Sequence, residues 1–278
     1  MSDHIGEDRS KLSPAKSNTE STAPKRNAFS ELMSPKTKQS STAREPKQIR
    51  TTQPFNPRDV RNGLLPYVLK PESFPSSLVI RYTEHSVLIK DAYPKSLLHL
   101  LLLPRDPSKY NLHPHAAFAD PAFLSLVRSE VSECIQLAAS ELSRTLSTTS
   151  TSCQARIEAM ESPSPPSELP NGRNFLKDLR VGIHAHPSMN HLHVHIITPD
   201  MSRETMRHRK HYNSFNTDFF IPVQDFPLAE DDIRRQVPHQ NANLSRDFKC
   251  WRCGRMFGNK FKELKEHLAT EFLEWKME

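Results

Sequence analysis

The stretch His191-Leu192-His193-Val194-His195-Ile196-Ile197 decides the fold and points to the site. Successive side chains of a β-strand point to opposite faces, so its three histidines should line one face. Leu192, Val194 and Ile196 should line the other face, against a hydrophobic core. A single strand histidine is usually structural, but three imidazoles on one face are not ordinary core filling. Two interpretations stay open: the imidazoles chelate zinc or copper, or one of them is a nucleophile whose tautomer its neighbours fix.

The surroundings of this stretch favour phosphoryl transfer. His184 ends an upstream strand, and the polar loop 185–190 can offer backbone N–H groups and the Ser188 hydroxyl to phosphate oxygens. Lys95 precedes a strand that carries His99, and we expect both side chains in the same cleft. A histidine that attacks phosphorus needs cations around the equatorial oxygens and an acid for the leaving group, whereas a metal site needs neither.

Apolar periodicity predicts the elements around this site. Strands are expected over 78–82, 86–90, 97–103, 180–184 and 192–198, with a last short apolar piece over 218–223. Helices are expected over 57–70, ending near Pro66, and over 122–146, where an apolar stripe recurs at helical spacing. Segment 105–120 is expected to be a loop, and the Ser/Thr/Pro-rich segment 147–170 an exposed insertion.

Composition divides the 278 residues into parts with different properties. Residues 1–55 are basic, poor in apolar periodicity and expected to be disordered, with a more hydrophobic island over 27–33 as a candidate docking segment. A catalytic domain over 56–225, a polar linker over 226–245 and a separate C-terminal module over 246–278 should follow. The formal charge of +6 points to a polyanionic partner, and no run is long and apolar enough for a membrane span.

The C-terminal module has the spacing of a zinc site. Cys250 and Cys253 form a knuckle, and His267 and Glu271 stand four residues apart on a predicted helix, so the four can surround one ion. A redox Cys-x-x-Cys pair, or three ligands with a water, are the alternatives. The block also carries six cations against one acid, which favours contact with phosphates: Lys249, Arg252, Arg255, Lys260, Lys262 and Lys265.

The sequence resembles the histidine triad (HIT) superfamily and, within it, the aprataxin family. The first resemblance rests on residues 181–195, with the alternation His-φ-His-φ-His-φ-φ. The second rests on the stretches 89–95, 99–104 and 210–217 together with the zinc-type module, so that it covers roughly residues 60–278. It implies an α+β fold with a HIT-like antiparallel sheet, flanking helices and a small C-terminal zinc finger. Residues 1–55 cannot form the forkhead-associated domain of animal aprataxins, which favours a fungal type.

This resemblance also implies the role of each site residue. His193 would attack the α-phosphorus of AMP on an adenylated DNA 5′ end, and His184 would protonate the leaving phosphate or stabilise its charge. His191 and His195 would flank the nucleophile. The residues expected to bind the AMP or DNA phosphates are Lys95, His99, Ser188, Lys210, His211 and Ser214. Zinc would be structural, through Cys250, Cys253, His267 and Glu271, and the chemistry would need no metal.

The resemblance therefore predicts a nuclear DNA 5′-adenylate hydrolase of single-strand break repair, with AMP as product and no membrane contact. The N-terminal tail is a candidate segment for binding a repair protein. One alternative is a HIT hydrolase of small nucleotides, such as adenosine phosphoramidate or dinucleoside polyphosphates, which would not require the basic zinc module. The other is a zinc-dependent nucleic-acid-binding protein with an inert HIT fold, against which the complete set of histidines argues.

Overall fold

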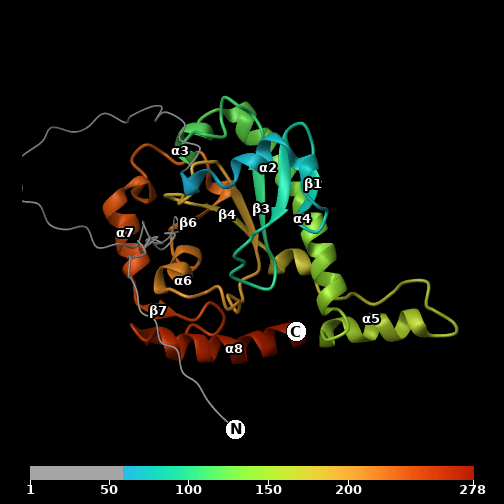
Figure 1. The fold of residues 1–278 in the computed structure, drawn as a ribbon. Coiled ribbons are helices and arrows are strands. Elements are labelled where there is room, and N and C mark those ends of the chain that lie inside the picture. The colour runs from blue at the N-terminus through green and yellow to red at the C-terminus, as the bar shows by residue number, and fades with distance from the viewer. Residues whose placement is uncertain (1–58) are drawn as a thin grey trace, which may run out of the picture. The chain divides into compact units, whose positions relative to one another are not determined.

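A computed structural model of the chain describes residues 59–278 (Figure 1). The expected disorder of residues 1–55 and the candidate docking segment 27–33 lie outside the described residues. Within them, no helix is long and apolar enough to cross a membrane.

One six-stranded antiparallel sheet carries the site, in the order β1-β2-β3-β5-β4-β6. Its strands are β1 (Val79–Tyr82), β2 (Ser86–Lys90), β3 (His99–Pro104), β4 (Arg180–His184), β5 (Val194–Ile197) and β6 (Phe220–Pro222). These bounds confirm the predicted strands to within a few residues. Strand β5, next to the centre, is shorter than predicted, and it begins only after His191 and His193.

The two faces of the sheet are covered by different elements. The long helix α4 (Pro121–Leu146) covers one face, and Leu100 and Leu102 of β3 join its apolar stripe in the main core (Figure 1). Leu101 and Leu103 point to the opposite face, where they pack with α2 (Leu65–Leu69) in a second cluster. This alternation confirms that the α4 face buries Leu192, Val194 and Ile196, as predicted from period two.

The helix predicted over 57–70 is divided in the described part. A 3-10 turn (η1, Val60–Asn62) is followed by α2, and Pro66 lies in the first turn of α2 rather than near its end. The first turn tolerates proline because its N–H groups have no partner within the helix.

Two segments for which the sequence predicted no helix, the loop 105–120 and the exposed insertion 147–170, contain one each. Segment 105–120 includes α3 (Pro114–Ala117), and Phe118 directly after it is buried in the main core. The insertion 147–170 includes α5 (Thr151–Glu161), a helix with a single fully buried side chain, Cys153. The composition of the insertion did not predict α5, because a helix that buries so few side chains needs almost no apolar stripe.

The predicted linker 226–245 is wrong, since this segment is folded. Helix α7 (Val237–Ser245) packs against α6 (Arg209–Asn216). Its buried positions are the amides Gln240 and Asn243, and Gln240 Nε2 donates to the Arg234 carbonyl at 2.7 Å. Hydrogen bonding allows these polar groups to be buried, so the segment looks like a solvated linker in the sequence.

The C-terminal module consists of β7 (Phe248–Lys249), β8 (Met256–Gly258) and α8 (Phe261–Met277). Gly254 ends the cysteine knuckle at φ +76°, a conformation that glycine adopts without steric cost. The module shares its core with the rest of the protein. Leu264 and Leu268 of α8 pack in one cluster with residues of β5 and β6, and Trp275 belongs to the main core.

Candidate active site

His193 has the tautomer that a nucleophile needs. It lies just before β5, is 4% exposed, and its Nδ1 is 2.7 Å from the carbonyl oxygen of His191. A carbonyl only accepts hydrogen bonds, so Nδ1 carries the proton and Nε2 keeps its lone pair. Burial lowers the pKa of His193, which favours the neutral ring. The geometry therefore leaves Nε2 of His193 as an unprotonated nitrogen at neutral pH.

A chain of hydrogen bonds fixes the tautomer of His195. The backbone N–H of Lys95 donates to Nδ1 of His99 at 3.3 Å, so the neutral His99 ring carries its proton on Nε2. This Nε2–H donates to Nδ1 of His195 at 2.9 Å. The remaining proton of His195 is on Nε2, a buried atom without a hydrogen-bond partner among the described residues. His195 can therefore donate that N–H to a bound phosphate beside His193, whose ring centroid is 4.9 Å away.

The same hydrogen bonds bear on the metal interpretation of the histidines. Asp91, His99 and His195 bring one ligand atom each to within 4.8 Å of one another. A metal would need the lone pair of His99 Nε2, but a neutral imidazole has one lone-pair nitrogen, and Nδ1 uses it to accept from Lys95. The arrangement favours proton-donating histidines over a metal cage.

His184, at the end of β4, lies beside His195. Its ring centroid is 4.5 Å from that of His195, and its Nε2 is buried without a partner among the described residues. Burial, followed by the charge of His193, holds the pKa of His184 well below its usual value. Sequence reasoning gave no role to Phe215 of α6, yet its ring centroid is 4.6 Å from His184 and 5.2 Å from His195. Phe215 therefore packs against the two histidines and limits their movement.

His191 is placed differently from the prediction of three histidines on one strand face. Its ring contacts Tyr110, at 5.6 Å between centroids, and its carbonyl accepts a hydrogen bond from His193 Nδ1–H. The backbone here bonds to other segments, because Leu192 N–H donates to the Tyr110 carbonyl and Asn190 N–H to the Arg61 carbonyl. These bonds replace the strand ladder, so His195 is the one histidine of the three within β5.

Lys95 and His211, which were predicted to bind phosphate, lie near the site histidines. Lys95 donates from Nζ to the Tyr93 carbonyl, and burial lowers the pKa of Lys95. The charge of Lys95 also contributes to the lowered pKa values of His184, His195 and His211. For His211, in the first turn of α6, burial is the larger cause and the pKa falls to about 3. Lys95 therefore supplies positive potential close to the histidines.

The other three predicted phosphate ligands have looser connections to the site. The Ser214 hydroxyl donates to the His211 carbonyl at 3.0 Å, within α6. Ser188 is half-buried in the loop 185–190, and Lys210 is half-buried on α6. Among the described residues, no hydrogen bond links the side chains of Ser188, Lys210 or Ser214 to the rings of the site histidines.

The C-terminal module brings the four predicted zinc ligands together. One ligand atom each of Cys250, Cys253, His267 and Glu271 lies within 4.8 Å of the others. His267 Nε2 is 3.1 Å from the Cys253 sulfur and 2.9 Å from Glu271 Oε1. Two thiolates, an imidazole and a carboxylate fit tetrahedral zinc, and bound zinc would hold the knuckle on α8. The complete set favours a four-ligand structural zinc site over a redox pair or three ligands with a water.

The zinc knuckle and the histidine site meet at α6. The Tyr212 hydroxyl donates to the Lys249 carbonyl at 2.9 Å and accepts from the Trp251 N–H at 3.0 Å. Three residues further along α6, Phe215 packs against the histidines. Tyr212 thus connects the backbone around Cys250 to the helix that borders His184 and His195.

Comparison with known families agrees with this architecture. Residues 74–202 match the HIT domain, and residues 216–274 match the C2HE / C2H2 / C2HC zinc-binding finger. The fold and the site therefore define a HIT-domain nucleotide hydrolase with a zinc-binding finger at its C-terminal side.

Relatives narrow this class. The chain is 32% identical to the aprataxin-like protein of Schizosaccharomyces pombe, over 84% of this chain and 90% of the relative. It is 33% identical to the aprataxin-like protein of Saccharomyces cerevisiae, over 76% of this chain and 95% of the relative. A crystal structure of the aprataxin ortholog Hnt3 in complex with DNA superposes with a TM-score of 0.61 at 33% identity, covering 77% of this chain and 96% of that one. The chain belongs to the aprataxin family.

Proposed function

We propose that this protein releases AMP from adenylated 5′ ends of DNA through a covalent intermediate on His193. Nε2 of His193 forms a bond to the α-phosphorus of the adenylate, and the phosphoanhydride bond to the DNA 5′-phosphate breaks. Water then attacks the same phosphorus, the P–N bond breaks, and AMP leaves. The observation that carries this proposal is the 2.7 Å hydrogen bond from His193 Nδ1 to the His191 carbonyl, which leaves Nε2 free to attack.

The neighbouring histidines complete the chemistry. The unpartnered Nε2–H of His195 donates to a phosphate oxygen as charge develops in the transition state. His184, 4.5 Å from His195 between ring centroids, protonates the departing 5′-phosphate or stabilises its charge. An anionic phosphate bound in this buried site would raise the pKa values of both rings, so they would become better proton donors once substrate is present.

Two further observations support DNA as the substrate. Arg207, Lys262 and Lys265 line one groove beside α8, and cations on one surface bind a phosphate backbone with little dependence on sequence. Related structures include Hnt3 in complex with DNA and guanosine, at a TM-score of 0.60. A nuclear location and a role in single-strand break repair follow as parts of this proposal, and the N-terminal tail stays a candidate for binding a repair protein.

The test compares two adenylates that share the reacting phosphorus. The purified protein receives an adenylated nicked duplex or free adenosine phosphoramidate, and kcat/KM is measured for each. We expect the nicked duplex to be preferred by roughly 10²-fold or more, since the groove cations contact only the DNA. Equal values, or a preference for the phosphoramidate, would assign the protein to the small-nucleotide hydrolases instead. Activity on neither substrate would favour the inert nucleic-acid-binding alternative.

A further inference from the structure

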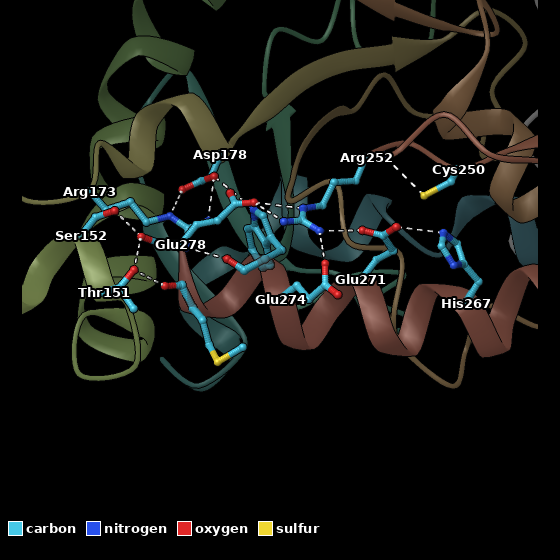
Figure 2. A network of polar contacts seen from close by, with 12 residues as sticks. Thr151, Ser152, Arg173, Asp178, Cys250, Arg252, His267, Glu271, Glu274 and Glu278 are labelled. Atoms are coloured by element: carbon cyan, nitrogen blue, oxygen red, sulfur yellow. Dashed lines mark hydrogen bonds and ion pairs between the residues drawn. The ribbon is translucent and has the colours of Figure 1, made fainter.

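The two carboxylate oxygens of Glu271 have different partners. Oε1 lies 2.9 Å from His267 Nε2, inside the zinc ligand set, whereas Oε2 lies 2.7 Å from Nη1 of Arg252 (Figure 2). The Glu271 side chain is buried on α8, at 5% exposure of the residue. One oxygen is therefore available to the metal, and the other is held by a guanidinium.

Arg252 contacts a second ligand through its backbone. It lies between the two cysteines of the knuckle, and its N–H donates to the Cys250 sulfur at 3.4 Å. Its guanidinium is also paired with Glu274 at 2.6 Å and with Glu278 at 2.7 Å, on the same side of α8 (Figure 2). With three carboxylates around it, Arg252 has little capacity left for a DNA phosphate, although the sequence groups it with the DNA-contacting cations.

The net charge of the zinc ligand set explains why the Arg252 guanidinium lies beside Glu271. A zinc ion with two thiolates, one carboxylate and a neutral imidazole carries one net negative charge, while a second histidine in place of the carboxylate would leave the set neutral. The family model that matches this chain includes both kinds of finger. A net charge in a partly buried site is unfavourable unless a counter-charge lies close by. Arg252, hydrogen-bonded to the ligand that adds the charge, is that counter-charge.

We propose that Arg252 is a positioning residue of the zinc site, which compensates the charge of Glu271 and keeps one of its oxygens directed at the metal. Groups that orient metal ligands contribute roughly ten- to hundredfold to metal affinity. The competing explanation is purely structural, because Arg252 also connects the knuckle to Glu274 and Glu278 and would then stabilise α8 whatever the fourth ligand is.

A double-mutant cycle on the full-length zinc-loaded protein separates these explanations. The variants are Arg252→Ala, Glu271→His and the combination, and the measurement is the rate of zinc release to a chromogenic chelator. We expect Arg252→Ala alone to accelerate release roughly ten- to hundredfold. In the Glu271→His background the ligand set is neutral, so the same substitution should change the rate less than about threefold. Equal acceleration in both backgrounds, or no acceleration in either, overturns the proposal.

Two controls keep the result interpretable. Arg255→Ala removes a cation of the same knuckle, whose guanidinium lies over the Phe257 ring at 5.1 Å, and should leave zinc release unchanged. If the Glu271→His variants do not fold, Arg252→Lys replaces them, since a lysine keeps the charge but not the planar fork and should restore most of the zinc retention. A failure of Arg252→Lys to do so would also contradict charge compensation.

A second readout tests the correction to the DNA-binding surface. If Arg252 serves the metal, Arg252→Gln at saturating zinc should leave the salt dependence of DNA binding as in the unchanged protein. Lys265→Ala should instead reduce the slope of log affinity against log salt by about 0.9, the value for one lost phosphate contact. A comparable reduction for Arg252→Gln would show that its guanidinium contacts DNA.

Discussion

The Tyr212 hydroxyl accepts a hydrogen bond from the Trp251 backbone N–H at 3.0 Å, and this bond joins the zinc knuckle to the helix that borders His184 and His195. The Tyr212 residue is fully buried, so neither its hydroxyl nor its backbone partners would regain water if the bond were lost. The zinc module is therefore attached to the catalytic fold by directed polar contacts as well as by a shared apolar core.

The first prediction concerns this connection. Tyr212→Phe keeps the ring but leaves the Lys249 carbonyl and the Trp251 N–H without their partner, which should destabilise the protein by about 1–3 kcal/mol. A lower Tm should be accompanied by a lower kcat on an adenylated nick, because α6 also carries Phe215. Tyr82→Phe is the control, since that side chain is about half exposed. A Tyr212→Phe variant with a lower Tm and unchanged kcat would show that the connection does not reach the histidines.

The sequence was sufficient for most of the sheet because its strands are short apolar stretches bounded by polar or turn residues, and the central strand β3 is a nearly continuous apolar run that is buried on both faces. It failed where polar residues are buried. Gln240 and Asn243 fill the interior side of α7 with amides, and no hydrophobicity pattern distinguishes them from a linker. Trp275 belongs to the catalytic core, although by sequence it lies within the module predicted to be separate.

The candidate site was predictable in composition but not in geometry. Spacing identified the histidines, yet His191 and His193 precede the strand because their segment bonds to Tyr110 and Arg61 from distant parts of the chain. Such long-range backbone contacts leave no local pattern. The ion pair of Arg252 with Glu271 could not be predicted either. A run of charged residues has the same sequence pattern whether its members face solvent or a buried carboxylate.

The second prediction tests the nucleophile. His193→Ala should reduce AMP release by at least roughly 10³-fold, because no other described residue offers an unprotonated nitrogen at that position. Enzyme quenched in acid during turnover should carry AMP on His193 when its peptides are analysed by mass spectrometry. His85→Ala, at an exposed histidine of the β1–β2 turn, should behave like the unchanged protein. A label on any other residue would contradict the proposed role of His193.

The third prediction uses the burial of His99, which lowers its pKa from 6.5 to about 4. Between these values the unfolded chain binds a proton that the folded protein does not. Stability therefore falls as pH decreases from 6.5 to 4, by roughly 1.4 kcal/mol per pH unit for this histidine, and it is fully retained above 6.5. Urea unfolding at a series of pH values measures the slope.

Two variants assign that slope to the buried ring. His99→Gln should reduce the pH dependence by about one proton's contribution, whatever it does to stability at pH 7. Asn174→Ala should leave the slope unchanged, since this exposed side chain carries no titratable group. If the slope of His99→Gln equalled that of the unchanged protein, His99 would be protonated alike in both states and the assignment of its tautomer would lose its basis.

The last prediction concerns which surface of the protein binds DNA. The sequence alone would recommend deleting residues 246–278, but Trp275 lies in the main core and Leu264 and Leu268 pack against residues of β5 and β6. A deletion should therefore unfold the catalytic domain, which a thermal melt would show. Point substitutions on the groove beside α8 avoid this unfolding, because the Lys262 and Lys265 side chains are exposed. They test whether the groove binds DNA while the histidines carry out the chemistry.

The double variant Lys262→Ala with Lys265→Ala should reduce the slope of log affinity against log salt by about 1.8, or 0.9 for each lost phosphate contact. Hydrolysis of adenosine phosphoramidate should stay within about twofold, since a small adenylate spans no groove. Lys90→Ala is the control, because Lys90 interacts with Glu141 of α4, the helix that packs on the sheet face opposite the histidines. An unchanged salt slope, or equal losses on both substrates, would mean that α8 supports the catalytic fold and that DNA is held elsewhere.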